Sequence, residues 1–305
     1  MDGILPLWKE AGMTSHDCVF KVRKLLKMKK VGHTGTLDPD VDGVLPICLG
    51  RATKVAEYIT DAGKSYRGEV TIGWSTTTED ASGELVDKKP VDKEWVVEEI
   101  TTVLNSFVGR IQQTPPMFSA VKVNGKRLYE YARQGISVER PSRIVTIYSI
   151  KIIRDSFKQN EDSITFSFDV SCGKGTYIRT LAVMIGEAMG YPAHMSKLTR
   201  TSSAAMTQEH CITLSQLEKI ADQIEEVKQY LFPLEAGVSQ LKKLDISDKV
   251  AEKVKNGAVL PLPKEWPAAL DEQVVFMENG HALAIYHCHP SKEGLIKPTK
   301  VLWIE

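Results

Sequence analysis

The stretch Gly32-His33-Thr34-Gly35-Thr36-Leu37-Asp38-Pro39 combines glycines, a histidine and a carboxylate in front of a proline, and an apolar run continues it to Lys54. Pro39 restricts Asp38 to an extended conformation, so the carboxylate is presented in a fixed direction. This density of special residues predicts an active-site loop. The same Asp-Pro step is also a common turn opener, so these residues alone leave a purely structural role for Asp38 open.

The composition is that of an ordinary globular protein. The chain has 305 residues, of which 42% are hydrophobic and 26% are charged. That length suits one sizeable domain and a small second one. The 39 basic and 39 acidic residues give a net charge of zero. Any surface that binds RNA must therefore come from local clustering of basic residues.

The cysteines indicate a reducing compartment. They are scattered, they include no Cys-x-x-Cys pair, and they number five: Cys18, Cys48, Cys172, Cys211 and Cys288. This pattern favours free thiols over a zinc ribbon. His287-Cys288-His289 is the one hint of a metal site, and we interpret it as a strand end. Because the sequence shows no signal peptide and no apolar run of membrane-spanning length, we expect a cytoplasmic protein without a metal.

Hydrophobic periodicity predicts an irregular order of strands and helices. We expect strands at residues 4–8, 64–72, 144–153 and 163–172. Helices are expected at residues 18–26, 55–59, 95–107 and 214–230, and a further helix is expected to follow the glycine-rich turn at residues 173–175 and to continue to about Gly190. A loop is expected at residues 76–89. Since no Gly-x-Gly-x-x-Gly follows a strand, the order favours an α+β fold with a mixed sheet over a dinucleotide-binding fold.

The character of the chain changes beyond about residue 241. Short apolar segments at 274–277, 283–287 and 301–304 are separated by turns rich in Asn, Gly and Pro. This pattern predicts a small β-rich module that follows a proline-marked boundary. The expected organisation is a main domain at residues 1–235 and a small β-rich domain at residues 241–305.

A second distinctive segment begins at Gln113. Residues 113–135 interleave prolines, glycines, aromatic residues and basic residues. Such a composition is typical of a segment that contacts RNA through stacking and phosphate pairing. An exposed loop and helix without an RNA-binding role is the alternative.

Together with Lys64-Ser65-Tyr66 and Gly173-Lys174-Gly175-Thr176-Tyr177-Ile178-Arg179-Thr180-Leu181, these stretches closely resemble, in order, the motifs of the TruB family of bacterial tRNA pseudouridine synthases. The resemblance covers residues 13–200. It implies an α+β pseudouridine synthase domain at residues 1–235, with an RNA-contacting segment at 113–140, and a PUA-like RNA-binding domain at 241–305. The implied reaction converts the uridine at position 55, in the T loop of tRNA, to pseudouridine without a metal or organic cofactor. The T stem-loop is the expected partner, and no obligate protein partner is expected.

The resemblance also assigns catalytic residues. Asp38 corresponds to the essential carboxylate, and Arg179 to the arginine that pairs with it. Burial alone would favour the neutral form of an aspartate, so an ionised carboxylate in a pocket needs such a partner. Tyr66 corresponds to the tyrosine that stacks on the flipped uracil and assists proton transfer at C5.

Four further positions correspond to substrate-binding residues of the family. Lys64 lies near Tyr66 in the sequence, Tyr177 and Leu198 complete the apolar wall of the pocket, and His33 inserts into the T loop and displaces bases. Without the resemblance, the sequence favours a core aromatic residue of a strand for Tyr66 and a solvated loop residue for His33 over roles in the site.

Several alternatives stay open at the level of the sequence. The Asp38 carboxylate has three possible roles: attack on the sugar, attack on the base, or removal of a sugar proton. The rival functions are a non-catalytic tRNA-binding or folding chaperone and a sister pseudouridine synthase with another RNA target. Asp40, Asp42 and Thr199 depart from the family pattern, which we expect to affect RNA affinity and not the chemistry.

Overall fold

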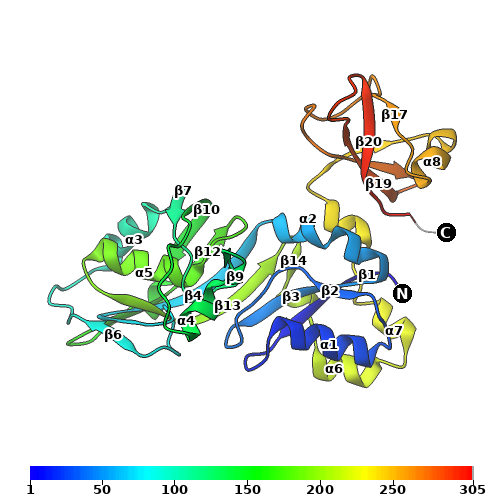
Figure 1. Cartoon of the computed structure of the whole chain (residues 1–305). Coiled ribbons are helices and arrows are strands. Elements are labelled where there is room, and N and C mark those ends of the chain that lie inside the picture. The colour runs from blue at the N-terminus through cyan, green and yellow to red at the C-terminus, as the bar shows by residue number, and fades with distance from the viewer. Residues whose placement is uncertain (304–305) are drawn as a thin grey trace. The chain divides into compact units, whose positions relative to one another are not determined.

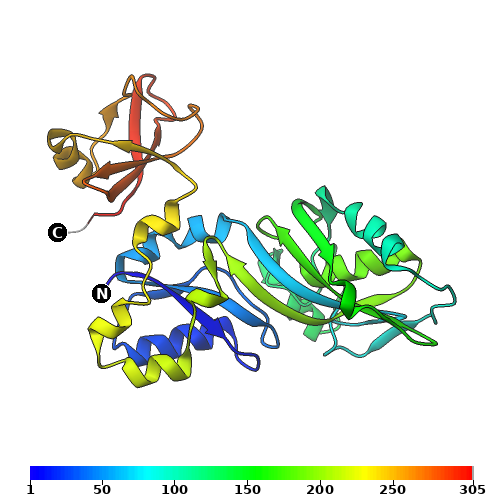
Figure 2. The ribbon, with the colours of Figure 1, turned by 180° about the vertical axis from the view of Figure 1, so that it is seen from behind.

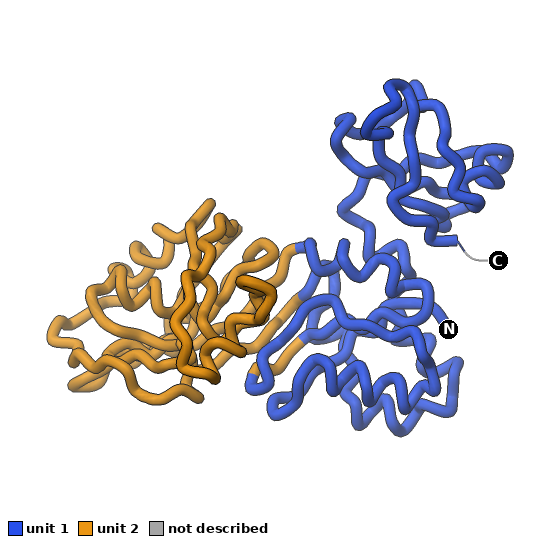
Figure 3. The backbone as a smooth tube through the Cα atoms, in the orientation of Figure 1, with its two compact units in different colours: residues 1–40, 44–62, 203–305 blue, residues 41–43, 63–202 orange. Residues whose placement is uncertain are grey.

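The computed structural model describes residues 1–303 (Figures 1 and 2). The chain divides into two compact units (Figure 3). Unit 1 comprises residues 1–40, 44–62 and 203–305, and unit 2 comprises residues 41–43 and 63–202. Each unit is therefore built from segments that are distant in the sequence. The domain boundary expected between residues 235 and 241 falls inside unit 1 and stays a prediction.

Unit 1 holds both ends of the described chain. Its elements before the C-terminal module are β1 (Gly3–Lys9), α1 (Ser15–Leu25), β2 (Val31–His33), most of β3 (Asp42–Leu49), η1 (Gly50–Val55), α2 (Ala56–Asp61), β14 (Met206–Thr207), η3 (Gln208–His210), β15 (Ile212–Thr213), α6 (Leu214–Ile220), α7 (Ile224–Lys228) and η4 (Leu234–Val238). Its sheet has the order β15-β1-β3, and β2 pairs with β3 in antiparallel fashion. The strand predicted at residues 4–8 is confirmed as β1.

Helix α1 begins where its sequence predicts. The Thr14 side chain accepts a hydrogen bond from the Asp17 N–H, and the Asp17 carboxylate accepts one from the Thr14 N–H, which completes a capping box. Cys18 and Val22 are fully buried on one face of the helix. The basic residues occupy the exposed positions, so the predicted amphipathic helix is confirmed.

The predicted helix at residues 214–230 is wrong, because two short helices replace it. α6 ends at Ile220 and α7 begins after Gln223, whose φ of −104° and ψ of 80° leave the helical region. Leu217 and Val227 are both fully buried. In one straight helix these two residues would lie about 80° apart around the axis, and the break lets both reach the core.

The C-terminal part of unit 1 is rich in β structure, as predicted. It contains β16 (Lys242–Asp245), α8 (Asp248–Lys255), β17 (Leu260–Pro261), β18 (Val274–Glu278), β19 (His281–Cys288) and β20 (Leu295–Val301), with the sheet order β16-β18-β19-β20-β17. The expected strand at residues 301–304 is wrong, since the strand lies at 295–301, and residue 304 is outside the described part. Lys297, Pro298 and Lys300 interrupt the apolar pattern of β20 and conceal it.

Both faces of this small sheet are buried. Val274 and Phe276 belong to the core of the module, where the Phe276 and Tyr286 rings stack with centroids 4.6 Å apart. The alternate residues Val275 and Met277 join a second core that includes Val55. The module therefore packs onto the η1 and α2 region of unit 1.

Unit 2 is a sheet with helices. Its elements are β4 (Lys64–Ile72), β5 (Trp74–Thr76), β6 (Leu85–Lys88), α3 (Val97–Asn105), β7 (Gly109–Gln113), β8 (Lys122–Val123), β9 (Lys126–Arg127), α4 (Leu128–Arg133), β10 (Arg143–Ile152), η2 (Arg154–Ser156), β11 (Lys158–Gln159), β12 (Ile164–Cys172), α5 (Ile178–Met189) and most of β13 (Ala193–Ser203). The strand order is β13-β4-β12-β10-β7, in which β4, β12, β10 and β7 pair in antiparallel fashion. β13 also pairs in parallel with residues 42–43, so the sheet is mixed, as expected.

The core of this sheet follows from the alternation of β12. Ile164, Phe166 and Phe168 are fully buried. Opposite Phe168, β4 carries Gly68, where an added Cβ would lie 2.7 Å from the Phe168 ring. α3 packs against β10 and against α5, and α5 packs against β4, so both helices cover one face of the sheet (Figure 1).

The loop predicted at residues 76–89 is wrong in part. β5 and β6 form a separate two-stranded hairpin, in which Trp74 pairs with Lys88. Leu85 and Val86 are the apolar residues of β6, and both are 62% exposed. They are adjacent, so β6 lacks the alternation of apolar and polar residues that marks a half-buried strand. The turn is closed by Asp80, whose carboxylate accepts hydrogen bonds from the hydroxyls of Thr78 and Ser82.

Candidate active site

The loop that carries Asp38 is held by its backbone on both sides of that residue. On one side, the Leu37 N–H donates to the Ser15 Oγ at 2.8 Å, and the hydroxyl donates to the Leu37 carbonyl at 3.3 Å. On the other side, the Pro39 carbonyl accepts from the Gly12 N–H at 2.9 Å and from the Lys9 Nζ at 3.0 Å. The half-buried Asp38 therefore extends from a fixed stretch of backbone.

The residues that hold this loop are themselves buried. Ser15 is 1% exposed and Lys9 is fully buried. A buried ammonium group is costly unless it is hydrogen-bonded, and Lys9 donates to the carbonyls of Glu10 and Pro39. Sequence analysis did not select either residue, because a hydroxyl or an ammonium that serves backbone carbonyls leaves no motif of its own.

His33 lies at the end of β2, five residues before Asp38 and in the same unit. Its Nδ1 accepts a hydrogen bond from the Gly35 N–H at 3.2 Å, which fixes the ring against its own turn. The next residue, Thr34, is fully buried, and its N–H and hydroxyl both donate to the Pro46 carbonyl. His33 is thus half-buried on a turn that is anchored to β3.

Lys64 and Tyr66 lie on one face of β4 in unit 2. The two residues are separated by one position, so their side chains point to the same side of the sheet. Lys64 pairs with Cys172 of β12 and is 8% exposed, and Tyr66 pairs with Val170 and is 9% exposed. Their predicted strand is confirmed with the same bounds, residues 64–72. Leu198 is half-buried on β13, the strand beside β4 in the sheet.

Tyr177 is the residue before α5, and Gln113 of β7 holds its backbone. The Gln113 side chain accepts from the Tyr177 N–H at 3.0 Å and donates to its carbonyl at 3.2 Å. The Arg143 guanidinium lies over the Tyr177 ring, 5.9 Å from its centroid. Gln113 is 1% exposed, so the start of α5 is fixed to the edge of the sheet.

Arg179, on the first turn of α5, is 5% exposed and holds two distant loops. Nη1 donates to the Thr78 carbonyl at 2.9 Å, and Nη2 donates to the Phe118 carbonyl at 2.9 Å. The Asp80 carboxylate lies 3.6 Å from Nη1. The planar guanidinium is therefore fixed in orientation, as bidentate recognition of a carboxylate requires.

Glu79 extends this cluster beside Arg179. The Thr180 hydroxyl donates to its carboxylate at 2.7 Å, and Arg140 Nη1 lies 4.0 Å away. Burial raises the pKa of Glu79 above its ordinary value, although the Thr180 hydrogen bond and the positive charge of Arg179 act in the opposite direction. The carboxylate thus joins α5 to the end of the 113–140 segment.

A hollow of about 740 Å³ lies between the two loops that Arg179 holds. Thr78 and Gly83 line it from the β5–β6 loop, whereas Met117, Phe118 and Arg140 line it from the 113–140 segment. Sequence analysis missed the β5–β6 side of this site. The available signal was the Asp80-Ala81-Ser82-Gly83 turn between β5 and β6, since turns of this composition commonly form functional loops.

Each unit therefore gathers part of the predicted site. Asp38 and His33 lie in unit 1, whereas Lys64, Tyr66, Tyr177, Arg179 and Leu198 lie in unit 2. Within residues 1–303, no three His, Cys, Asp or Glu side chains are grouped as metal ligands would be. His287 and Cys288 end β19, which confirms the strand-end interpretation of that sequence.

Family models match most of the chain. Residues 23–178 match the N-terminal domain of the TruB family pseudouridylate synthases, and residues 179–239 match the tRNA pseudouridylate synthase B C-terminal domain. The chain belongs to the TruB family of pseudouridylate synthases. It is therefore an RNA pseudouridine synthase, an isomerase, as its motifs predicted.

Curated TruB relatives extend the similarity to the full chain. The tRNA pseudouridine synthase B of Listeria welshimeri is 56% identical over 302 residues, 99% of this chain and 98% of the relative. That of Bacillus subtilis is 54% identical over 304 residues, with the same shares.

Solved structures agree with the TruB assignment. A Cbf5-Nop10-Gar1 complex contains a chain with a TM-score of 0.75 and 29% identity, and the match covers 99% of this chain and 85% of the other. An H/ACA RNP bound to a substrate RNA that contains 2'-deoxyuridine gives a TM-score of 0.73 at 27% identity, with the same shares. These neighbours confirm the α+β fold with a mixed sheet. Within the described residues, no helix has the length and apolar character needed to cross a membrane.

Proposed function

We propose that this TruB protein converts the uridine at position 55 of tRNA, in the T loop, to pseudouridine, with Asp38 as the catalytic carboxylate. The observation that carries the proposal is the fixation of Leu37 and Pro39 on both sides of Asp38. A nucleophile or base must be held within a fraction of an ångström of its target, and a clamped loop meets that need. The names of the curated relatives support tRNA as the substrate.

Pseudouridine formation breaks the C1′–N1 glycosidic bond, turns the uracil and rejoins it to the sugar through C5. The atoms of product and substrate are the same, so the isomerisation requires no oxidant or reductant. Asp38 has three alternative roles: attack on the sugar, attack on the base, or removal of a sugar proton. Each of them requires the ionised carboxylate. Arg179 keeps the carboxylate ionised by pairing with it, and the carbonyls of Thr78 and Phe118 support the guanidinium in the required orientation.

Tyr66 provides the aromatic platform for the flipped uracil and assists proton transfer at C5. A base taken out of its stack loses its neighbours, and an aromatic ring replaces part of that contact. Lys64 lies two residues away on the same face of β4, which supports a place for both side chains in one pocket. Both side chains are buried, as a water-poor pocket requires.

The remaining residues bind the T stem-loop. His33 enters the T loop from its anchored turn, Tyr177 and Leu198 form the apolar wall of the uracil pocket, and residues 113–140 contact the RNA backbone and bases. The 113–140 segment carries the groups that this task needs. Arg127 and Arg133 both lie over the Tyr129 ring, at 5.8 and 5.3 Å from its centroid. Exposed guanidinium groups beside a half-buried aromatic ring are typical of RNA-binding surfaces.

The C-terminal module at residues 241–305 is proposed to bind RNA as well, in the manner of a PUA domain. We expect no obligate protein partner and a cytoplasmic location, and both stay predictions. A sister enzyme that acts on another RNA is the second candidate, because the solved neighbours include a synthase in an H/ACA RNP. The lower identity of those neighbours, 27–29% against 54–56% for the tRNA enzymes, favours tRNA.

The experiment is a site-mapped pseudouridine assay on an unmodified tRNA transcript. The expected result is conversion of one uridine, at position 55. A transcript with cytidine at that position is the matched control and should yield no pseudouridine. Conversion elsewhere in the tRNA, or tight binding without any conversion, would contradict the proposal and would favour the sister-synthase or the chaperone function.

A further inference from the structure

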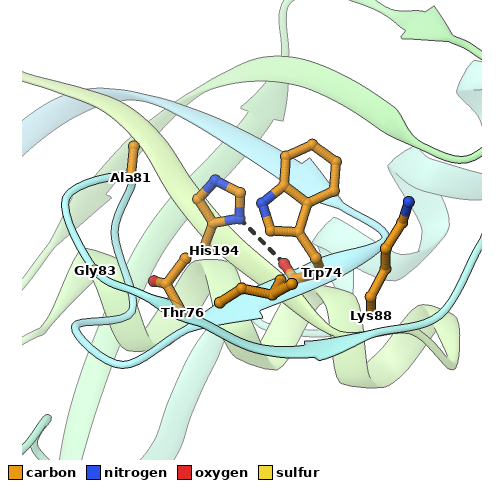
Figure 4. A pocket seen from close by; sticks show the side chains of 7 residues that line it. Trp74, Thr76, Ala81, Gly83, Lys88 and His194 are labelled. Carbon is orange, nitrogen blue, oxygen red and sulfur yellow. Dashed lines mark hydrogen bonds between the residues drawn. The ribbon is translucent and has the colours of Figure 1, made fainter.

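A hollow beneath the β5–β6 hairpin has no part in the proposed chemistry. It has a volume of about 390 Å³, within the range of ligand pockets, and is lined by Trp74, Thr76, Ala81, Gly83, Leu85, Lys88 and His194 (Figure 4). All of these residues belong to unit 2. The lining combines a flat aromatic ring, an apolar side chain and a cationic one, which together suit a molecule with a flat ring and a negative charge.

His194 presents a hydrogen-bond acceptor at this hollow. The side chain is 4% exposed, and its Nδ1 lies 3.1 Å from the Trp74 carbonyl oxygen. A carbonyl only accepts, so Nδ1 carries the hydrogen, and in this tautomer Nε2 is the acceptor nitrogen of the ring. Among residues 1–303, no group donates to Nε2. An acceptor that has no donor from the protein favours an occupant that brings an N–H group.

Trp74 and Lys88 supply the other two contacts. The Trp74 ring lies 5.2 Å from the His194 ring and is half-buried, between His194 and Lys88 in Figure 4. The Lys88 ammonium is paired with Asp162 at 3.2 Å, but both side chains are more than half exposed. A surface ion pair of this kind contributes little stability, so the ammonium is able to turn toward a phosphate.

We propose that this hollow binds one unpaired nucleotide of the RNA substrate, distinct from the uridine that reacts. The base stacks on Trp74 against Leu85, an amino group of the base donates to His194 Nε2, and the phosphate pairs with Lys88. Adenine, cytosine and guanine carry such an amino group. In uracil the N3–H is flanked by carbonyl oxygens that would face the imidazole lone pair, so uracil is disfavoured. This inference rests on the proposed function for the identity of the RNA.

The hollow suits a nucleotide within a chain better than a free nucleotide. It offers a single cation, so a free nucleotide with several phosphates would gain little there, whereas an RNA bound elsewhere on the enzyme presents each nucleotide at a high local concentration. The location supports the same choice. The loop between β5 and β6 lines this hollow with Ala81 and Gly83 and contributes Thr78 to the larger hollow beside Arg179.

The test compares the affinity of four full-length proteins for an unmodified tRNA transcript: wild type, Trp74→Leu, Lys88→Ala and Lys89→Ala. Lys89 is the matched control, because it neighbours Lys88 but donates to the Gly190 carbonyl and lies over the Tyr191 ring. We expect Trp74→Leu to weaken binding about tenfold through lost stacking. Lys88→Ala should weaken it about two- to threefold and flatten the salt dependence by about one phosphate contact. Lys89→Ala should bind as the wild type does.

Conversion at saturating tRNA should stay within twofold of wild type in all variants, since none of these residues contacts the reacting uridine. Equal affinities of wild type, Trp74→Leu and Lys88→Ala would overturn the inference. If Trp74→Leu fails to fold, Lys88→Ala still decides, because Lys88 is exposed. A wild type that makes no pseudouridine in tRNA would instead refute the proposed function, which separates the two failures.

A titration with free mononucleotides tests whether the hollow binds a nucleotide within an RNA chain or a free nucleotide. Tryptophan fluorescence of the wild type is titrated with AMP, CMP and UMP, with Trp74→Leu as the reference. We expect quenching only at millimolar concentrations, stronger for AMP and CMP than for UMP. Micromolar binding of a mononucleotide, together with unchanged tRNA affinity in Lys88→Ala, would assign the site to a free nucleotide and contradict the proposal.

Discussion

The Leu37 N–H donates to the Ser15 hydroxyl at 2.8 Å, and the hydroxyl donates back to the Leu37 carbonyl at 3.3 Å. Leu37 directly precedes Asp38, so this pair of hydrogen bonds joins the proposed catalytic loop to the first turn of α1. The capping box at Thr14 fixes that turn in its place. The helix start and the loop thus form one structural element, although 22 residues separate Ser15 from Leu37.

Ser15→Ala should loosen the Asp38 loop. The buried Leu37 N–H would lose its acceptor, which costs about 1–3 kcal/mol of unfolding free energy. Conversion at saturating tRNA should fall at least about tenfold, because small displacements of a catalytic group are costly. Chemical denaturation and single-turnover kinetics measure the two effects. Ser106→Ala, an exposed hydroxyl at the end of α3, is the control and should change neither. Wild-type behaviour of Ser15→Ala would show that the loop is held in another way.

Arg179→Lys should impair conversion more than binding. A lysine keeps the charge, but one ammonium group cannot serve the carbonyls of Thr78 and Phe118 in the geometry of a planar guanidinium. We expect the single-turnover rate to fall at least about a hundredfold, with tRNA affinity within a few-fold of wild type. Arg67→Lys is the matched control, because Arg67 forms a bidentate pair with Asp169 at an exposed position. Equal rates for Arg179→Lys and wild type would refute the role of Arg179.

Gly43→Ala should destabilise the fold more than Gly109→Ala. Both glycines have positive φ, +124° and +111°, so both substitutions carry backbone strain of about 1–3 kcal/mol. A Cβ at Gly43 would also meet the backbone of Arg200, whereas nothing lies within 4 Å of a Cβ at Gly109. We expect Gly43→Ala to lose at least about 1 kcal/mol more than its control in chemical denaturation. Equal losses would mean that strain alone acts at Gly43.

Glu79→Gln should gain stability relative to wild type as the pH rises. Burial raises the pKa of Glu79 above 4.5, so the folded state favours the protonated form. In the wild type, this preference stabilises the folded state below pH 4.5, and the stabilisation is lost as the pH rises through the folded-state pKa of Glu79. Urea denaturation of variant and wild type at several pH values between 4 and 7 measures the difference.

Glu98→Gln provides a control with the opposite sign. The hydrogen bond from Arg154 lowers the pKa of the exposed Glu98, so its contribution is present above pH 4.5 and is lost as the pH falls through the folded-state pKa. The Glu98→Gln variant should therefore lose stability relative to wild type as the pH rises. A Glu79→Gln curve with the same slope as the Glu98→Gln curve would contradict the assigned environment of Glu79.

Regular alternation made part of the fold predictable from the sequence. β4 has the predicted bounds and β12 differs by one residue, because buried and more exposed residues alternate along β12 and along the first part of β4. β20 was misplaced and the β5–β6 hairpin was missed, because lysines, a proline and exposed apolar residues break the alternation there. The break between α6 and α7 contains neither glycine nor proline, so it carried no local signal.

The candidate site is indicated by the sequence where side chains form motifs and not where backbone groups make the contacts. The motif at residues 32–39 indicated Asp38, and family resemblance added Arg179 and Tyr66. The partners that orient Arg179 are carbonyls 101 and 61 residues away, which any residue type could supply. Lys9 and Ser15 likewise form hydrogen bonds with backbone groups that are distant in the sequence, those of Pro39 and Leu37. Such contacts depend on the tertiary fold and leave no pattern in the sequence.

The proposed catalyst of the isomerisation in the T loop is the Asp38 carboxylate. The most direct measurement is mass-spectrometric mapping of pseudouridine in an unmodified tRNA transcript after incubation with wild type, Asp38→Asn or Asp40→Asn, each with its tRNA affinity determined in parallel. We predict conversion at position 55 by wild type and by Asp40→Asn, an exposed neighbour. Asp38→Asn should give no product while its affinity stays within a few-fold of wild type. Product at position 55 with Asp38→Asn would contradict the account.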